Sequence, residues 1–158
     1  MASASKRLLK ELSSYNGDPN PALEALQPVS EEDLFTWTAI LRGPVDTPYQ
    51  GGHWLIRIKM PASYPLQPPT MQFLTKICHP NIHFDSGEVC LDVLKSQWTP
   101  AWTISSALTA VQAMLSDPEP DSPLNIDAAN LVRCGEDSGY AALVHYYTVR
   151  YAKSVPTI

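Results

Sequence analysis

Cysteine is scarce in this 158-residue sequence, which has three, far fewer than a small disulfide-stabilised secreted domain. Basic residues are also few: 11 Lys and Arg stand against 16 Asp and Glu, without the basic excess typical of nucleic-acid-binding proteins. No apolar run approaches the ~20 residues that span a bilayer, and the segment MASASKRLLKEL lacks the apolar core of a secretory signal. We therefore expect a single domain over residues 1–158 in a reducing compartment, without nucleic acid or direct membrane insertion.

Proline, by contrast, is abundant. With fifteen prolines among 158 residues, the proline fraction is about twice the usual ~5%. Many of them cluster in residues 61–69 and 118–123. Because proline fixes φ and donates no backbone hydrogen bond, these stretches are excluded from helix interiors and central strands. They are predicted to be stiff connections, and long ordered loops in a compact domain usually carry function.

Three segments alternate apolar and polar residues, as half-buried strands do: residues 34–41, 53–60 and 70–74. Residues 22–28 are ambiguous between strand and helix. Successive strands with no helix between them indicate an antiparallel meander covered on one face. The side chains expected to point inward are Phe35, Trp37, Ala39, Leu41, Trp54, Ile56, Ile58, Met60, Met71 and Phe73.

Helical periodicity flanks these strands. Residues 3–14 read as a short helix capped by Ser3 or Ser5, with an apolar stripe and a basic face. The stripe comprises Leu8, Leu9 and Leu12, and the basic face Lys6, Arg7 and Lys10. After residue 100, helices are predicted at 104–116 (N-cap Thr103), 126–134 (N-cap Asn125, followed by Gly135) and 136–153. The last should place Leu143, Val144, Tyr147 and Tyr151 on one face. This order predicts the α+β class.

The irregular segment 75–102 separates the strands from the later helices and contains two cysteines and two histidines. A zinc site is disfavoured, because Cys78 and His79 are adjacent and no familiar pair of spaced ligands completes a set. A cysteine nucleophile is a second interpretation, although Cys–His hydrolases take their base from a distant part of the chain. On spacing alone, a structural role for Cys90 is favoured.

Six motifs in this order resemble the ubiquitin-conjugating enzyme family, over essentially the whole chain. They are GPVDTPYQGGHW (43–54), YPLQPP (64–69), HPN (79–81), GEVCLDVL (87–94), QWTPAWTI (97–104) and DPEPDSPLN (117–125). The loop HFDSGEVCLDVLKSQWTPAWT and the PEPDSPLN turn are most similar to the peroxisomal, or peroxin, branch. The resemblance implies an N-terminal helix, a four-stranded antiparallel meander that takes in residues 22–28, an active-site loop and three helices.

The resemblance also implies a role for each site residue. Cys90 would accept ubiquitin as a thioester, needing no cofactor or metal, since a positioned thiol suffices for thioester exchange. Asn81 would steady the oxyanion or organise the loop, and we weigh these roles equally. His79 would brace the loop. Asp92, Asp121 and Ser122 would be gate residues that orient the acceptor; because many relatives have Asp in place of Ser122, a carboxylate that activates the acceptor is in doubt.

Partners follow in the same way. Leu66, Pro100 and Ala101 match the loops that dock RING-type ligases, although Leu66 could instead fold into the core. Lys6, Arg7 and Lys10 match the face read by the ubiquitin-activating enzyme, and solvation alone is the simpler interpretation. The branch resemblance implies a cytoplasmic protein that a membrane-anchored peroxisomal protein recruits to the peroxisome for import-receptor recycling.

Two departures from the family pattern concern the site. The interval from Asn81 to Cys90 is one residue longer than in most relatives, so the oxyanion geometry cannot simply be copied. Cys78 replaces an aromatic residue, and it is either a small core residue or a disulfide partner of Cys134. A conjugating enzyme for a ubiquitin-like modifier and a non-peroxisomal enzyme stay open, whereas an inactive variant is disfavoured because Cys90 is present.

Overall fold

The computed structural model describes residues 2–158 and begins with one long helix, α1 (Ala2–Gly17). The prediction of a helix here is confirmed, but its details were wrong. The helix starts before Ser3, so neither Ser3 nor Ser5 is its cap, and it extends to Gly17 rather than residue 14. Leu8 is fully buried, whereas Leu9 is 53% exposed. Leu9 is adjacent to Leu8 and turns about 100° from it, out of the face that meets the sheet.

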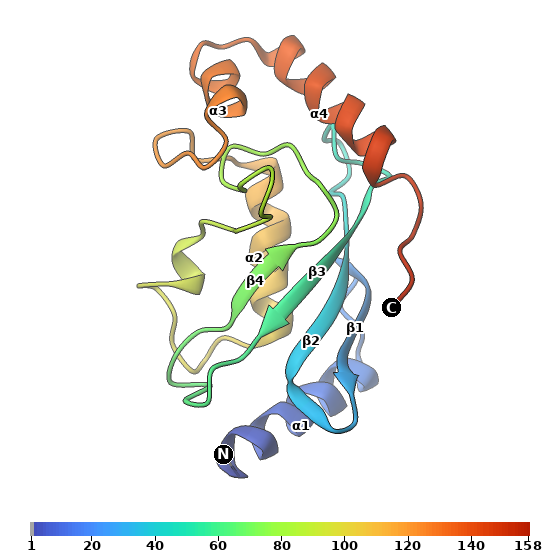
Figure 1. Cartoon of the computed structure of the whole chain (residues 1–158), viewed down its shortest axis with the longest axis vertical. Helices are drawn as coiled ribbons and strands as arrows, with labels where there is room; N and C mark the ends of the chain where they lie inside the picture. The colour runs from blue at the N-terminus through green and yellow to red at the C-terminus, as the bar shows by residue number, and fades with distance from the viewer. Residues whose placement is uncertain (1) are drawn as a thin grey trace.

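Four strands form an antiparallel meander in the order β1-β2-β3-β4 (Figure 1). They are β1 (Leu23–Ser30), β2 (Asp33–Arg42), β3 (His53–Lys59) and β4 (Thr70–Phe73). All of the ambiguous segment 22–28 except Ala22 thus belongs to an edge strand, where Pro28 is tolerated. The predicted alternation is confirmed: Trp54, Ile56 and Ile58 in β3 are fully buried. Phe35, near the start of β2, is only half-buried.

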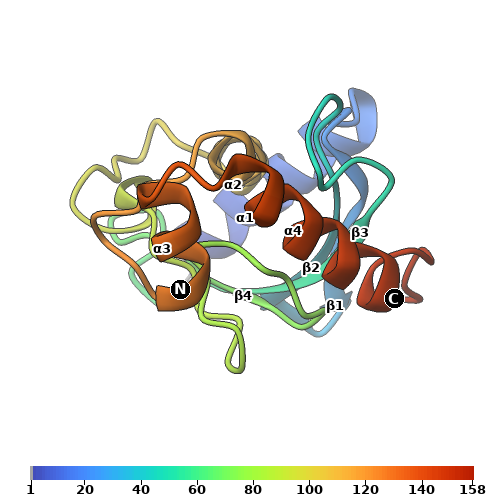
Figure 2. The ribbon, with the colours of Figure 1, turned by 90° about the horizontal axis from the view of Figure 1, so that it is seen from above.

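Helix α2 (Ile104–Ser116) lies across one face of the sheet (Figure 2). Thr103 is its N-cap, as predicted, and forms a capping box with Ser106. All six apolar residues of its predicted stripe are buried: Ile104, Ala107, Leu108, Val111, Met114 and Leu115. The core therefore lies between this helix and the inner face of the sheet, with α1 closing one end.

The last two helices are α3 (Ile126–Arg133) and α4 (Asp137–Tyr151). Asn125 caps α3, and Gly135 follows it with a φ of 71°, both as predicted. The predicted face of α4 is partly wrong, because Val144 and Thr148 are buried whereas Tyr151 is 41% exposed. None of the helices in residues 2–158 is both long and apolar enough to cross a membrane.

Candidate active site

Cys90 lies directly after a short hairpin that runs alongside β4. Ile82 and Val89 pair across this hairpin in an antiparallel bridge, and the Cys90 N–H donates to the carbonyl oxygen of Asn81 at 2.9 Å. The Cys90 side chain is half-buried and its thiol is free. Backbone pairing therefore holds the predicted nucleophile beside the HPN motif.

Residues 83–88 form the turn of this hairpin, closed by the hydrogen bonds from the His83 N–H to Glu88 and from the Gly87 N–H to His83. Gly87 has a φ of 76°, and a Cβ atom there would lie 1.9 Å from the carbonyl oxygen of Phe73. Glycine is thus required both by the left-handed backbone and by the close approach to β4. This turn reverses the chain so that Cys90 returns to hydrogen-bond with the backbone of Asn81.

His79 is fully buried and joins the hairpin to the end of α2. Its Nε2 lies 2.8 Å from the carbonyl oxygen of Met114, and its Nδ1 accepts the Asn81 N–H at 3.0 Å. These partners place the ring proton on Nε2, since a carbonyl only accepts. Burial lowers the pKa of His79 to about 4, so the ring is neutral near pH 7. This geometry has the form of the predicted brace and leaves neither ring nitrogen free to act as a base.

The Asn81 side chain is buried, and both its amide nitrogen and its amide oxygen are hydrogen-bonded. Its Nδ2 donates to the carbonyl oxygens of Glu119 (2.8 Å) and Ser122 (3.0 Å), and its Oδ1 accepts the Glu119 N–H at 2.8 Å. Asn81 thereby fastens residues 117–122 beside the hairpin. Since both amide hydrogens are already used, donation to an oxyanion requires the release of one of these bonds.

Cys90 opens into a groove of about 390 Å3 between the hairpin, α2 and the loop that follows α2. The residues that line it are Asn81, Cys90, Leu91, Asp92, Ala110, Ala113, Met114, Asp117, Glu119 and Ser122. The predicted gate residues Asp92 and Ser122 are both exposed at this groove, whereas Asp121 is exposed but is not part of the lining. Asp117 and Glu119, which the sequence prediction missed, supply carboxylates despite the serine at position 122.

The other two cysteines stand apart from this groove. Cys78 is buried in the core, where burial raises its pKa to about 11 and keeps the thiol protonated. Cys134 is exposed at the end of α3, and neither residue is in a disulfide. The interpretation of Cys78 as a small core residue is therefore confirmed, and its pairing with Cys134 is wrong.

The two loops expected to meet a ligase are joined to each other. Leu66 is 77% exposed rather than folded into the core, and Pro100 and Ala101 are exposed as well. The indole N–H of Trp98 donates to the carbonyl oxygen of Pro65 at 2.8 Å, so the buried Trp98 links one loop to the other. The exposed residues Leu66, Pro100 and Ala101 thus lie on two loops that this hydrogen bond connects.

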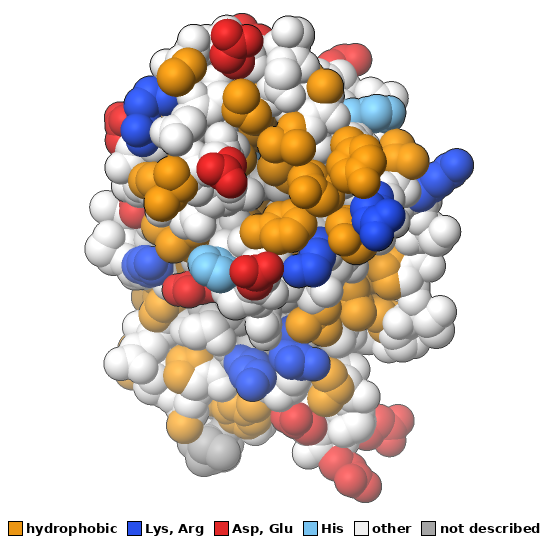
Figure 3. Space-filling view, turned by 45° about the horizontal axis from the view of Figure 1, so that its top comes forward, with side chains coloured by type: hydrophobic (Ala, Val, Ile, Leu, Met, Phe, Trp, Pro, Cys, Tyr) orange, Lys and Arg blue, Asp and Glu red, His pale blue; other side chains and the backbone are white. Residues whose placement is uncertain are grey.

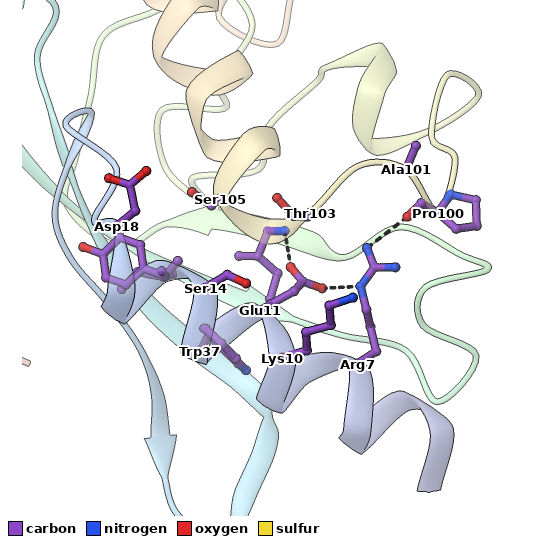
Figure 4. A pocket seen from close by; sticks show the side chains of 13 residues that line it. Arg7, Lys10, Glu11, Ser14, Asp18, Trp37, Pro100, Ala101, Thr103 and Ser105 are labelled. Atoms are coloured by element: carbon purple, nitrogen blue, oxygen red, sulfur yellow. Dashed lines mark hydrogen bonds and ion pairs between the residues drawn. The ribbon is translucent and has the colours of Figure 1, made fainter.

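The three residues of the expected basic face of α1 differ in their surroundings. Lys6 and Lys10 are exposed, but Arg7 donates to the carbonyl oxygen of Pro100 at 3.0 Å (Figure 4). Arg7 also donates to the carbonyl oxygen of Trp102 at 2.7 Å. Arg7 also binds the Glu11 carboxylate at 2.9 Å. Arg7 therefore links α1 to the loop before α2. Its position on the predicted basic face did not indicate this structural role.

Glu11 is the centre of this second network. One carboxylate oxygen accepts the Ile104 N–H at 2.7 Å, and the other accepts the Tyr64 hydroxyl at 2.6 Å. Burial and the adjacent carboxylate raise the pKa of Tyr64 above its ordinary value, so its hydroxyl stays a donor. Ile104 is 93 residues away in sequence, and no local pattern could have revealed this contact.

Lys95 is a further residue that the sequence prediction overlooked. Its Nζ lies 3.9 Å from the Cys90 Sγ, and the side chain is exposed. The only sequence signal was its place five residues after Cys90. Over residues 2–158, no three His, Cys, Asp or Glu side chains gather as they would around a metal ion.

Comparison with known proteins agrees with this architecture. The family model described as "Ubiquitin-conjugating enzyme" matches residues 7–148. A ubiquitin-conjugating enzyme E2 pex4 of Dictyostelium discoideum is 49% identical over 92% of this chain and 97% of its own length. Protein PEROXIN-4 of Arabidopsis thaliana is 43% identical over 94% of each.

A solved structure extends the similarity to three dimensions. Pex4p of H. polymorpha, crystallised with the soluble domain of Pex22p, superposes with a TM-score of 0.92 at 37% identity. The match covers 96% of this chain and 100% of that one. The family-model match and these whole-length relatives show that this chain belongs to the ubiquitin-conjugating enzyme family, with peroxin-4 proteins among its relatives.

Proposed function

We propose that Cys90 carries ubiquitin as a thioester and passes it to a substrate in cooperation with a RING-type ligase. The observation that carries this proposal is the free, half-buried Cys90 thiol in a groove that the Asn81 and His79 contacts hold in shape. Thioester exchange is close to energetic balance, so position matters more than strong activation of the thiol. ATP is consumed by the activating enzyme, before this chain acts.

Incubation with activating enzyme, ATP and ubiquitin tests this assignment. A thiol-reducible adduct should form with the wild type, a longer-lived oxyester with Cys90→Ser, and no adduct with Cys90→Ala. Cys78→Ala and Cys134→Ala are the matched controls and should retain the adduct. A reducible adduct that survives in Cys90→Ala and maps to Cys78 or Cys134 would overturn the proposal. Parallel charging with ubiquitin-like modifiers tests the alternative modifier.

Two exposed surfaces are assigned to the other enzymes of the pathway. Leu66, Pro100 and Ala101 form the ligase edge, because their exposed side chains stand on loops that Trp98 holds together. Lys6 and Lys10 remain available to an acidic surface of the activating enzyme, whereas Arg7 is already engaged in the fold. Leu66→Ala should reduce ligase-stimulated discharge, and Lys6→Glu with Lys10→Glu should slow charging. The opposite pattern would reverse the two assignments.

Recruitment to peroxisomes would use the aromatic face of α4, by binding the soluble domain of a membrane-anchored peroxisomal protein. Tyr146 and Val149 are about half exposed. The Tyr147 ring meets Tyr146 edge to face, with 5.2 Å between ring centroids, and stacks on Tyr151 at 6.1 Å. Figure 3 shows apolar side chains gathered on the side where α3 and α4 lie. Figures 1 and 2 place α4 away from the short helix η1 (Asp92–Leu94) beside Cys90. The Pex4p relative, crystallised with the soluble domain of Pex22p, supports a partner of this kind.

Val149→Asp is expected to weaken such binding at least tenfold, because it places a charge at the centre of an apolar contact. Val155→Asp, at the exposed end of the chain, is the matched control. Unchanged affinity of Val149→Asp for the partner's soluble domain, or uniform cytosolic distribution in cells whose peroxisomal membrane proteins are intact, would contradict the assignment.

A further inference from the structure

The segment between α2 and α3, residues 117–125, supplies part of the wall of the groove that contains Cys90. Three of its nine residues are prolines, which donate no backbone hydrogen bond and are excluded from helix interiors and central strands. The position of this segment therefore depends on contacts with other parts of the chain. We call it the gate loop, because it carries the predicted gate residues Asp121 and Ser122.

Two groups hold the gate loop on the side of the HPN motif. The Asn81 side chain binds the backbone of Glu119 and the carbonyl oxygen of Ser122. The Pro80 carbonyl oxygen accepts two N–H groups at the end of the loop, at 2.8 and 3.0 Å. Neither group binds Pro120, which lies in the middle of the loop.

Arg133 holds the middle of the gate loop from another element. It lies in the last turn of α3, and its Nη2 donates to the carbonyl oxygen of Pro120 at 2.7 Å. The side chain is exposed, and among residues 2–158 no carboxylate oxygen lies within 4.0 Å of its nitrogen atoms. The guanidinium group thus makes a charge-assisted hydrogen bond to the loop instead of an ion pair.

We propose that Arg133 is a positioning residue for the transfer of ubiquitin from Cys90 to the acceptor. The inference rests on the proposed thioester function. Pro120 directly precedes Asp121 and Ser122, so the hydrogen bond that fixes its carbonyl group also fixes the direction in which the chain continues into the two gate residues. Arg133 acts through these residues and does not itself touch the acceptor.

The two steps of the cycle should depend on Arg133 to different extents. During charging the attacking group is the Cys90 thiol of this chain, and Asn81 holds the inner side of the loop without help from Arg133. During discharge a separate acceptor enters the groove. Its nitrogen or sulfur bonds to the thioester carbon as the bond to the Cys90 Sγ breaks, and the Cys90 thiolate takes up the proton that the acceptor loses.

Discharge is the step that is sensitive to the position of the gate residues. The reacting atoms have to meet at ~3–3.5 Å in the correct direction, and a misplacement of ~1 Å can slow such a reaction ~100-fold. A loop released at Pro120 but still held by Asn81 should be displaced less than this. We therefore expect the loss of Arg133 to slow discharge moderately and to leave charging intact.

Single-turnover assays on the full chain test the proposal. Arg133→Ala should be charged near the wild-type rate, and its discharge onto free lysine and onto free cysteine should slow by the same factor, about tenfold, because a displaced loop misplaces either acceptor. Arg133→Lys keeps a long cationic donor and should recover most of the rate. Lys153→Ala, which removes a positive charge from an exposed residue after α4, is the matched control and should discharge like the wild type.

Amide hydrogen exchange separates positioning from a general loss of structure. In Arg133→Ala the Asp121 and Ser122 N–H groups, which bond to Glu119 within the loop, should exchange faster. The Asp117 N–H, which donates to carbonyl groups of α2, should exchange as in the wild type. The Tm should fall by no more than ~3 °C, since a single exposed hydrogen bond is lost.

Four outcomes would overturn the inference: discharge of Arg133→Ala at the wild-type rate, an equal loss of charging and discharge, a loss confined to one acceptor, or Arg133→Lys as slow as Arg133→Ala. Faster exchange at Asp117 as well would assign Arg133 a purely structural role and would also contradict it. Failure of the wild type to form any thioester would instead refute the proposed function itself.

Discussion

The two ends of α2 are held by polar side chains from distant parts of the chain, and the two ends are built in opposite ways. At the N-terminal end the Glu11 carboxylate accepts the Ile104 N–H at 2.7 Å, and at the C-terminal end the His79 ring donates to the Met114 carbonyl at 2.8 Å. The helix dipole favours an anion at the first end and a cation at the second. Only the first end carries its favoured charge.

Burial explains the difference. Arg7 accompanies Glu11, whose side chain is 8% exposed, so a charge is compensated there. His79 is fully buried with no acidic partner in hydrogen-bonding contact, and its pKa falls to about 4. The N-terminal end of α2 therefore depends on an ionic network, whereas the C-terminal end, near Cys90, depends on neutral hydrogen bonds. The two ends should respond differently to mutation and to pH.

The largest effect is expected from Glu11→Ala. It leaves the Ile104 N–H, the Tyr64 hydroxyl and Arg7 without their shared acceptor. Breaking a largely buried pair from one side costs about 3–5 kcal/mol of the free energy of unfolding. That loss corresponds to a fall in Tm of roughly 10 °C for a protein of this size. Glu11→Gln, which keeps one acceptor oxygen, should lose clearly less in thermal denaturation; equal losses would show that the ionic network is unimportant.

The pH response should come from the His79 end. Below its ordinary pKa of 6.5 an unfolded histidine takes up a proton, but folded His79 does so only near pH 4. Protons therefore favour the unfolded state, and stability is lost as the pH falls through this window. Between pH 6.5 and 4 the loss attributable to His79 should be about 3 kcal/mol.

Denaturant titrations across this pH range measure that loss. His79→Gln retains a hydrogen-bond donor but does not titrate, so its stability should fall less steeply than that of the wild type. His145→Gln, a change at an exposed histidine, should keep the wild-type slope. Identical slopes for the wild type and His79→Gln would contradict a neutral buried ring.

Asn81→Ala should have a smaller effect on stability, about 2 kcal/mol, because the freed carbonyls of Glu119 and Ser122 lie in a loop that water can reach. Its effect on transfer should be larger than its effect on charging. A donor to the oxyanion is worth about 2.7–4 kcal/mol in the transition state, and a thiolate acceptor needs less help than an amine.

Single-turnover discharge of pre-charged enzyme measures this selectivity. Charging of Asn81→Ala should stay near the wild-type rate, discharge onto free lysine should slow strongly, and discharge onto free cysteine should slow less. Equal losses for the two acceptors would refute a role for Asn81 in oxyanion stabilisation. Loss of charging itself would indicate that Asn81 serves only to hold residues 117–122.

The smallest effect is expected from Trp98→Phe, which removes the hydrogen bond to the Pro65 carbonyl and costs about 1 kcal/mol of the free energy of unfolding. Amide hydrogen exchange should locate the change. The Leu66 N–H, which donates to Ser63 at 2.8 Å, should exchange faster, whereas the Glu119 N–H, bound to Asn81, should not. Faster exchange at both sites would mean that the two ends of α2 are not independent.

Local patterns were sufficient for most of the regular structure. Alternation in residues 53–60 predicted a strand that buries Trp54, and the spacing after Thr103 predicted both α2 and its buried face. These signals are readable because the side-chain period of a strand or a helix is set by the backbone itself. Two predictions failed where such a signal was missing. The start of α1 was misplaced, because the helix has no serine cap. The buried face of α4 was partly wrong, because its apolar residues point in several directions.

The candidate site shows the same contrast between what local sequence patterns predict and what only the folded structure reveals. The resemblance carried by contiguous motifs was enough to predict Cys90, Asn81 and His79 as site residues. It could not assign the partners of those residues, since the contacts of His79 with Met114 and of Asn81 with Glu119 span 35 and 38 positions. Only the tertiary structure showed that both amide hydrogens of Asn81 are occupied, that Arg7 is an anchor and that the Lys95 amine contacts the thiol. The physical reason is that hydrogen bonding and burial depend on what the folded chain brings together, whereas periodicity records only what each segment does alone.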